Sequence, residues 1–108
     1  MNKKIQKATK RINEIKKCLQ GIGSMVPGSL SQQQRKDSQG KMYGSYWKLG
    51  YTHKMKSRSH YVPEELVKSI QEQNMEYKKF KNLIEEWIEL ALFIATEELD
   101  QAKKNIGN

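Results

Sequence analysis

Residues 40–63 have the sequence GKMYGSYWKLGYTHKMKSRSHYVP, in which aromatic, basic and small residues alternate. Alternation with a period of two is typical of β-strands, because successive side chains point to opposite faces of the sheet. We therefore expect a β-hairpin with a first strand over residues 43–51, a turn around residues 51–54 and a second strand that ends near Tyr61. In the first strand the following residues are predicted to face the core: Tyr43, Ser45, Trp47, Leu49 and Tyr51.

The basic residues of the second strand share one face: Lys54, Lys56, Arg58 and His60. We expect this face to be the outer one and to include Tyr46 and Lys48 of the first strand. Rings beside cations offer base stacking and phosphate contacts together, and a two-stranded ribbon fits the major groove of DNA. Arg58 is the first candidate for a directed contact, since its planar guanidinium binds a phosphate or a guanine edge through two nitrogens. The alternative is an ordinary hairpin whose lysines keep an exposed sheet edge soluble.

A helical pattern precedes the hairpin. Apolar residues at intervals of three and four form a seam: Ile5, Ala8, Ile12, Ile15, Leu19 and Ile22. This seam predicts a helix over about residues 3–20, ended by Gly21 and Gly23. The lysines on its other faces are either a solvated surface or contacts to phosphate. Residues 24–40 are rich in Gly, Ser and Gln and contain Pro27, which predicts a connector with one short strand at residues 29–34.

A second helix is predicted after Pro63, because a proline followed by two acids suits the first turn of a helix. No Gly or Pro interrupts the chain from there until Gly107, so this helix extends for about forty residues. The expected fold is α+β: an N-terminal helix, a small antiparallel sheet of two to three strands, and a long C-terminal helix packing antiparallel on the first helix. We expect one domain in three parts, residues 1–21, 22–62 and 63–106.

Residues 87–95 are apolar apart from Glu89 and would be exposed in part if only one helix packed against them. The sequence therefore predicts a homodimer or a partner protein at this apolar belt. The residues expected at the interface are Leu83, Trp87, Leu90, Leu92, Phe93 and Ile94. The alternative is that the hairpin folds back over the belt with Trp47, Leu49 and Tyr61.

Charge is distributed unevenly along the chain, which has a net charge of +8. Residues 1–21 hold seven basic residues against Glu14, and residues 22–62 hold seven against Asp37. Residues 63–108 hold six lysines against ten acids. A basic protein favours an anionic partner such as a nucleic acid, an acidic protein surface or a membrane surface.

Several classes of protein are disfavoured. A single cysteine, Cys18, indicates a reducing, cytoplasmic setting, and its place beside Leu19 predicts that it is buried. We expect no export signal, no membrane segment and no membrane partner, because the longest apolar run spans only residues 90–95. His53 and His60 lack the spacing of zinc ligands, and no catalytic motif is present, so we expect a non-enzymatic protein without metal or cofactor.

Four motifs carry a resemblance: PGSL at 27–30, GK at 40–41, YGSYWKL at 43–49 and SRSHYVP at 57–63. Together with the long helix they resemble an uncharacterised family of small prokaryotic proteins over roughly residues 24–95. The resemblance implies an origin near mobile elements or phages and carries no assigned activity. Family members place cysteines before the aromatic strand, where this chain has none in residues 32–40, so the implied zinc role lapses here. A weaker architectural similarity is to the sheet-and-helix modules with which integrases hold DNA.

The function expected from these features is a non-catalytic, dimeric nucleic-acid-binding accessory protein, with duplex DNA favoured over RNA. The residues predicted to contact nucleic acid are Arg35, Lys36, Lys41, Tyr46, Lys48, Lys54, Lys56, Arg58 and His60. The alternative is a protein-interaction module, such as a phage-type inhibitor or a coiled-coil adaptor, that docks through the apolar belt.

Overall fold

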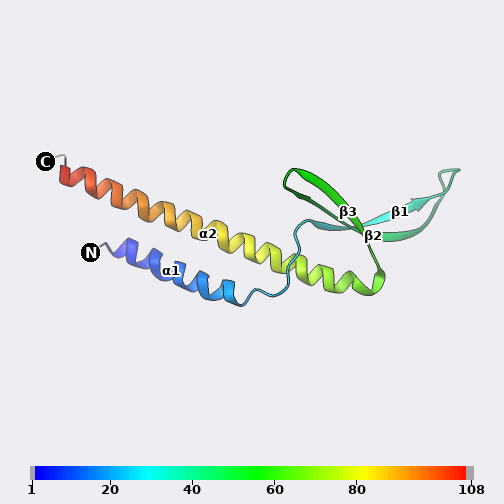
Figure 1. Cartoon of the computed structure of the whole chain (residues 1–108), viewed down its shortest axis with the longest axis horizontal. Helices are drawn as coiled ribbons and strands as arrows, with labels where there is room; N and C mark the ends of the chain where they lie inside the picture. Colours follow the sequence, from blue (N-terminus) through cyan, green and yellow to red (C-terminus); the bar gives the residue numbers. More distant parts are fainter. Residues whose placement is uncertain (1, 107–108) are drawn as a thin grey trace. The chain divides into compact units, whose positions relative to one another are not determined.

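The computed structural model describes residues 2–106, apart from the side chains of Tyr43 and Ile106, and confirms the α+β fold (Figure 1). Helix α1 spans Lys3–Gln20, strands β1, β2 and β3 span Ser29–Lys36, Met42–His53 and Lys56–Val62, a 3₁₀ turn η1 spans Glu64–Leu66, and helix α2 spans Val67–Ile106. The chain forms two compact units. The helical unit comprises the residues before Gly23 and after Lys78, and the sheet unit comprises Gly23–Lys78.

The helical unit is an antiparallel pair made by α1 and the larger part of α2. Asn2 caps α1, since its Oδ1 accepts hydrogen bonds from the backbone nitrogens of Lys4 and Ile5. The predicted seam is confirmed at its centre, where Ala8, Ile12 and Ile15 are buried. Cys18, expected to be buried, is exposed because it lies at the edge of that seam.

The antiparallel direction follows from contacts between the two helices. Asn2 at the start of α1 donates to Glu97 over 3.2 Å, while Arg11, nine residues later, contacts Glu86, which lies eleven residues earlier in α2. Residue numbers therefore rise along one helix as they fall along the other. The predicted packing of the long helix against the first is confirmed.

The sheet unit contains three antiparallel strands in the order β1-β2-β3. Leu30 pairs with Leu49, and Trp47 pairs with Val62. Leu49 and Val62 are buried, and so is the polar residue Asn74 of α2. The short strand expected at residues 29–34 is confirmed as β1 and continues to Lys36. The long helix is confirmed too, although its first turn, Glu64–Leu66, is 3₁₀ rather than α-helical.

The hairpin turn differs from the prediction and changes which residues share a face. Its two central residues, Lys54 and Met55, have φ values of 52° and 66°, as a two-residue type I′ turn requires. His53 therefore pairs with Lys56, and β2 extends two residues beyond the expected strand end. Sequence alone did not indicate this turn, because neither residue is the Gly, Asn or Asp that normally adopts positive φ.

The expected grouping of Tyr46 and Lys48 with the cations of β3 is wrong. Lys48 pairs with Tyr61, so the two residues lie on one face, whereas Arg58 pairs with Tyr51 on the other. A one-residue change in pairing moves every side chain of a strand to the opposite face, and the two-residue turn makes that change here. Tyr61, considered as a core residue, lies on the face opposite Leu49 and is 62% exposed.

Candidate nucleic-acid interface

One face of the sheet, here called the open face, carries two tyrosines beside cations. It consists of Ser31, Gln33, Tyr46, Lys48, Ser57, Ser59 and Tyr61, which the strand register places together, and of Arg35. The Arg35 guanidinium lies over the ring of Tyr46, 5.1 Å from its centroid. Such a pair is a cation–π contact, and the outer surface of the guanidinium remains a planar group able to stack further.

Small residues form the middle of the open face. Gly50 pairs with Ser29 on one side and with Ser59 on the other, and Thr52 shares a hydrogen bond of 2.9 Å with Ser57. A shallow hollow of about 500 Å³ lies over these residues, and Lys48 and Arg58 line it as well. A shallow floor of hydroxyls and backbone beside a lysine offers hydrogen bonds to phosphate or sugar oxygens.

The strands contain no acidic residue, so no carboxylate on them opposes an anionic ligand. The one acid between residues 22 and 62, Asp37, lies in the β1–β2 turn. Its Oδ1 accepts hydrogen bonds from the backbone nitrogens of Gln39 and Lys41, at 2.9 and 2.8 Å. Asp37 therefore has a structural role in the turn, and residues 22–62 hold seven basic residues against this one acid.

The cations of β3 lie on the other face, which also carries the buried Leu49 and Val62 and is here called the core face. Lys56, Arg58 and His60 are exposed toward the turn end of that face. His60 stacks on Tyr51 with ring centroids 5.6 Å apart, and its Nε2 lies 3.1 Å from the Tyr51 hydroxyl. This contact makes His60 part of the packing of the core face.

The nine predicted contact residues thus separate into three groups. The open face and the bulged end of β1 beside it hold Arg35, Lys36, Tyr46 and Lys48. The two turns hold Lys41 and Lys54, and the core face holds Lys56, Arg58 and His60. The sequence interpretation omitted Tyr61, which lines a second shallow hollow with Arg35 and Tyr46. Only knowledge of the two-residue turn would have placed Tyr61 on the same face as Lys48, and the sequence does not indicate that turn.

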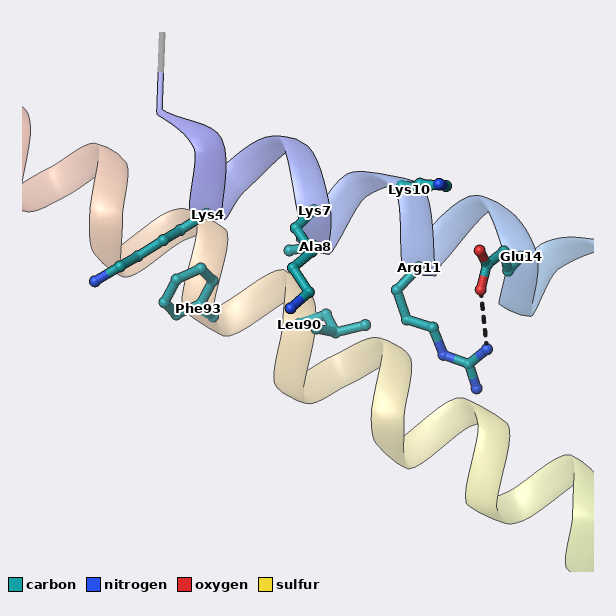
Figure 2. A pocket seen from close by; sticks show the side chains of 8 residues that line it. All are labelled: Lys4, Lys7, Ala8, Lys10, Arg11, Glu14, Leu90 and Phe93. Atoms are coloured by element: carbon teal, nitrogen blue, oxygen red, sulfur yellow. Dashed lines mark hydrogen bonds and ion pairs between the residues drawn. The ribbon is translucent and has the colours of Figure 1, made fainter.

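The helical unit has a hollow of about 640 Å³ between α1 and α2. Figure 2 shows its lining residues: Lys4, Lys7, Ala8, Lys10, Arg11, Glu14, Leu90 and Phe93. Lys4, Lys7 and Arg11 extend from α1 toward α2, where Leu90 and Phe93 form an apolar floor (Figure 2). The hollow is therefore basic at its rim and apolar at its base.

Arg11 is not available to phosphate, because it is paired with two carboxylates. Its Nε and Nη2 donate to Glu86 over 2.6 and 2.9 Å, and its Nη1 donates to Glu14 over 3.2 Å. The hydrogen bonds from Arg11 hold the pKa of Glu86 below its usual range. The pKa of Arg11 is raised in turn, first by its hydrogen bond to Glu86. Lys16 lies 5.4 Å from the ring centroid of Trp87, so it also contacts α2.

The six predicted interface residues differ in exposure. Leu83, Trp87, Leu90 and Ile94 are half-buried at intervals of four, three and four, which places them on the side of α2 that faces α1. Leu92 is 63% exposed and Phe93 is 37% exposed. Packing on α1 thus accounts for one part of the apolar belt and leaves the other part uncovered.

The chain matches no known family model, no curated protein and no solved structure. The resemblance to small prokaryotic proteins of the mobile-element type therefore stays a prediction. Between residues 2 and 106, no helix is sufficiently long and apolar to span a bilayer. The same residues contain no group of three or more His, Cys, Asp or Glu side chains arranged to hold a metal ion.

Proposed function

We propose that this protein is a non-catalytic nucleic-acid-binding protein that contacts its ligand with the open face of the sheet. The observation that carries the proposal is the Arg35–Tyr46 pair, which shares this acid-free face with Lys48 and the exposed Tyr61. Aromatic rings and arginine planes stack on unpaired bases, while lysines contact the phosphates between them. The open face offers both kinds of contact.

A single-stranded ligand suits this surface better than the duplex expected from sequence. A duplex was expected because a two-stranded ribbon would present Tyr46 and the β3 cations on one face, but the strand register places them on different faces. Base stacking on Tyr46 and Tyr61 requires bases that are free of a complementary strand. We therefore propose unpaired RNA or single-stranded DNA as the preferred ligand.

Fluorescence anisotropy with labelled single-stranded DNA, single-stranded RNA, duplex DNA and hairpin RNA tests the proposal. We expect the tightest binding to a single strand, and Tyr61→Ala to weaken it by about 5- to 150-fold, because one stacked base contributes about 1–3 kcal/mol. The matched control is Lys56→Gln, which removes a cation from the core face at a residue that lines neither hollow of the open face.

The control separates the two faces of the sheet. If Lys56→Gln weakens binding more than Tyr61→Ala does, the ligand contacts the core face and the open-face proposal is wrong. If the wild type binds none of the four ligands at low salt, nucleic-acid binding itself is wrong. The first result would instead support binding through the β3 cations, with Arg58 as the leading candidate for a directed contact.

The second candidate function is a protein-interaction module that docks through the apolar belt. The observation in its favour is the exposure of Leu92 and Phe93 after α1 has packed on α2. This function does not involve the open face, so Tyr61→Ala would leave partner binding unchanged. The two functions are therefore separable in one set of variants.

A further inference from the structure

α2 carries a second apolar seam that α1 does not cover. Its residues recur at intervals of four, three, four and three: Ile88, Leu92, Ala95, Leu99 and Ala102. All five are exposed, with Ile88 at 54%, Leu92 at 63% and Leu99 at 65% of their full surface. Such spacing is the heptad pattern of a helix that packs along its length against another helix.

This outer seam faces away from α1. The seam that faces α1 follows the same intervals five positions earlier, at Leu83, Trp87, Leu90, Ile94 and Glu97. At 3.6 residues per turn, an offset of five residues turns the second series about 140° away from the first around the helix. The apolar belt thus contains two separate seams, and the interface predicted from sequence mixed residues of both.

We propose that the outer seam pairs with the outer seam of a second copy of this chain in antiparallel orientation. The proposal is independent of nucleic-acid binding. Three large aliphatic side chains in one line on the surface are unfavourable in water, and a second copy supplies an identical apolar line that covers them. A second copy is the expected partner because the outer seam can be complementary to itself in shape and in the charges beside it.

Alternation of large and small residues selects the orientation. In a parallel pair each residue meets its own counterpart, so leucine would meet leucine and alanine would meet alanine in successive layers. The alanine layers would leave voids, which destabilise a packed interface. In an antiparallel pair centred near residue 97, Leu92 lies opposite Ala102 of the second copy and Ala95 lies opposite Leu99. Each of these layers then combines one large and one small side chain, which fills the space evenly.

The residues beside the seam agree with this register. On one flank Glu89 lies opposite Lys103 of the second copy, and the symmetry of the pair forms this contact twice. On the other flank Glu98 lies opposite its own counterpart, a like-charge contact that salt screens in solution. A parallel pair would join Glu98 to Lys103 instead, so charge permits either direction and the packing of leucine against alanine decides between them.

Sedimentation equilibrium of the full chain over a range of concentrations tests the association. We expect a dimer, and we expect Leu92→Glu to raise its dissociation constant by at least about 30-fold, because it places an unpaired charge in the centre of the seam. The matched control is Met75→Glu, which changes a 69%-exposed side chain of the same helix outside the seam. Unchanged helix content by circular dichroism shows that the variants remain folded.

A wild type that stays monomeric at every concentration overturns the proposal. So does a Met75→Glu variant that dissociates as readily as Leu92→Glu, since the effect would then not belong to the seam. A dimer that Leu92→Glu leaves intact overturns it as well, because the copies would associate through another surface.

Disulfide cross-linking tests the orientation. Two variants, Leu92→Cys and Ala102→Cys, are made in a Cys18→Ser background, because Cys18 is exposed and would form its own cross-links. The two proteins are mixed in equal amounts and oxidised. In the antiparallel register residue 92 faces residue 102, whereas two copies of residue 92 lie about 15 Å apart along the axis, too far for a disulfide. Mixed disulfides between the two variants support the proposal, and disulfides within each variant, or none at all, overturn the antiparallel register.

Discussion

Asn74 in α2 and Gly28 before β1 are joined by a hydrogen bond of 2.6 Å from the Asn74 Nδ2 to the Gly28 carbonyl oxygen. The same nitrogen donates to the Val26 carbonyl oxygen over 3.3 Å, and the Asn74 residue is only 7% exposed. The backbone nitrogen of Val26 donates in turn to the carbonyl oxygen of Gln73. These bonds fasten the connector that leads into the sheet to the first turns of α2.

Replacing Asn74 with alanine is expected to lower the free energy of unfolding by about 1–3 kcal/mol, because two backbone carbonyls lose their buried donor. The measurement is urea denaturation followed by circular dichroism. Asn82→Ala is the matched control, since Asn82 is exposed on the same helix. The control is expected to change stability by no more than about 0.5 kcal/mol. Equal effects of the two variants would mean that the Asn74 bonds contribute nothing specific.

Gly28 is a second sensitive position in the same connector. Its backbone φ is +97°, a value that residues with a side chain rarely adopt, and an added Cβ would lie 2.2 Å from the Gly50 carbonyl oxygen. Gly40 also has positive φ, at +82°, but an added Cβ would meet no atom within 4 Å. Gly28→Ala is therefore expected to destabilise the protein by about 1–3 kcal/mol more than Gly40→Ala, since the two share backbone strain and only one adds a collision. Thermal and urea unfolding of both variants measure the difference, and similar losses would show that the connector can move away from β2.

The elements of the fold were predictable because each depends on local pattern. The α1 seam, the Pro27 connector, the alternation in β2 and the acids after Pro63 are signals carried within a few residues, and each element formed close to its expected place. These patterns report which side of one element is apolar. They do not report how two elements are aligned.

Alignment is where the sequence interpretation failed. The alternation within β2 and within β3 was predicted correctly, but the β3 cations were assigned to the wrong face of the sheet. Aligning the two strands required the turn length, and positive φ at Lys54 and Met55 has no sequence signature. The interface on α2 shows the same limit. Leu90 and Leu92 are both apolar residues in one run, and only the position of α1 distinguishes the half-buried one from the exposed one.

The salt dependence of nucleic-acid binding gives a further test of which face binds. Lys48 lies at the edge of the hollow on the open face, so Lys48→Gln is expected to remove one phosphate contact and reduce the slope of log K against log salt by about 0.7 to 1. Lys56→Gln removes an equal charge from the core face and is expected to leave the slope nearly unchanged. Anisotropy titrations at four salt concentrations measure both slopes. A reversed order would place the phosphates against the core face, and equal reductions would indicate that charge acts without a defined site.

The ion pair between Arg11 and Glu86 predicts how stability responds to acid. Hydrogen bonding to Arg11 places the pKa of Glu86 in the folded protein below its value in the unfolded chain, which is about 4.3 for an ordinary glutamate. A group of this kind adds its stabilisation in full above the unfolded pKa and loses it as the pH falls through the folded pKa. The melting temperature is therefore expected to fall as the pH is lowered from 7 to below 4, and Glu86→Gln is expected to make this fall shallower while lowering stability at pH 7.

Glu85→Gln is the control for this pH dependence, because Glu85 is an exposed neighbour on the same helix. It removes the same charge from the chain without touching Arg11. The melting temperature of this variant is therefore expected to fall with decreasing pH as steeply as that of the wild type. Both side chains of the Arg11–Glu86 pair are about 40% exposed, so salt should weaken their interaction and reduce the difference between the two variants. If Glu85→Gln and Glu86→Gln flatten the acid slope equally, the loss of stability in acid reflects the net charge of α2, and the contact with Arg11 has no separate part in it.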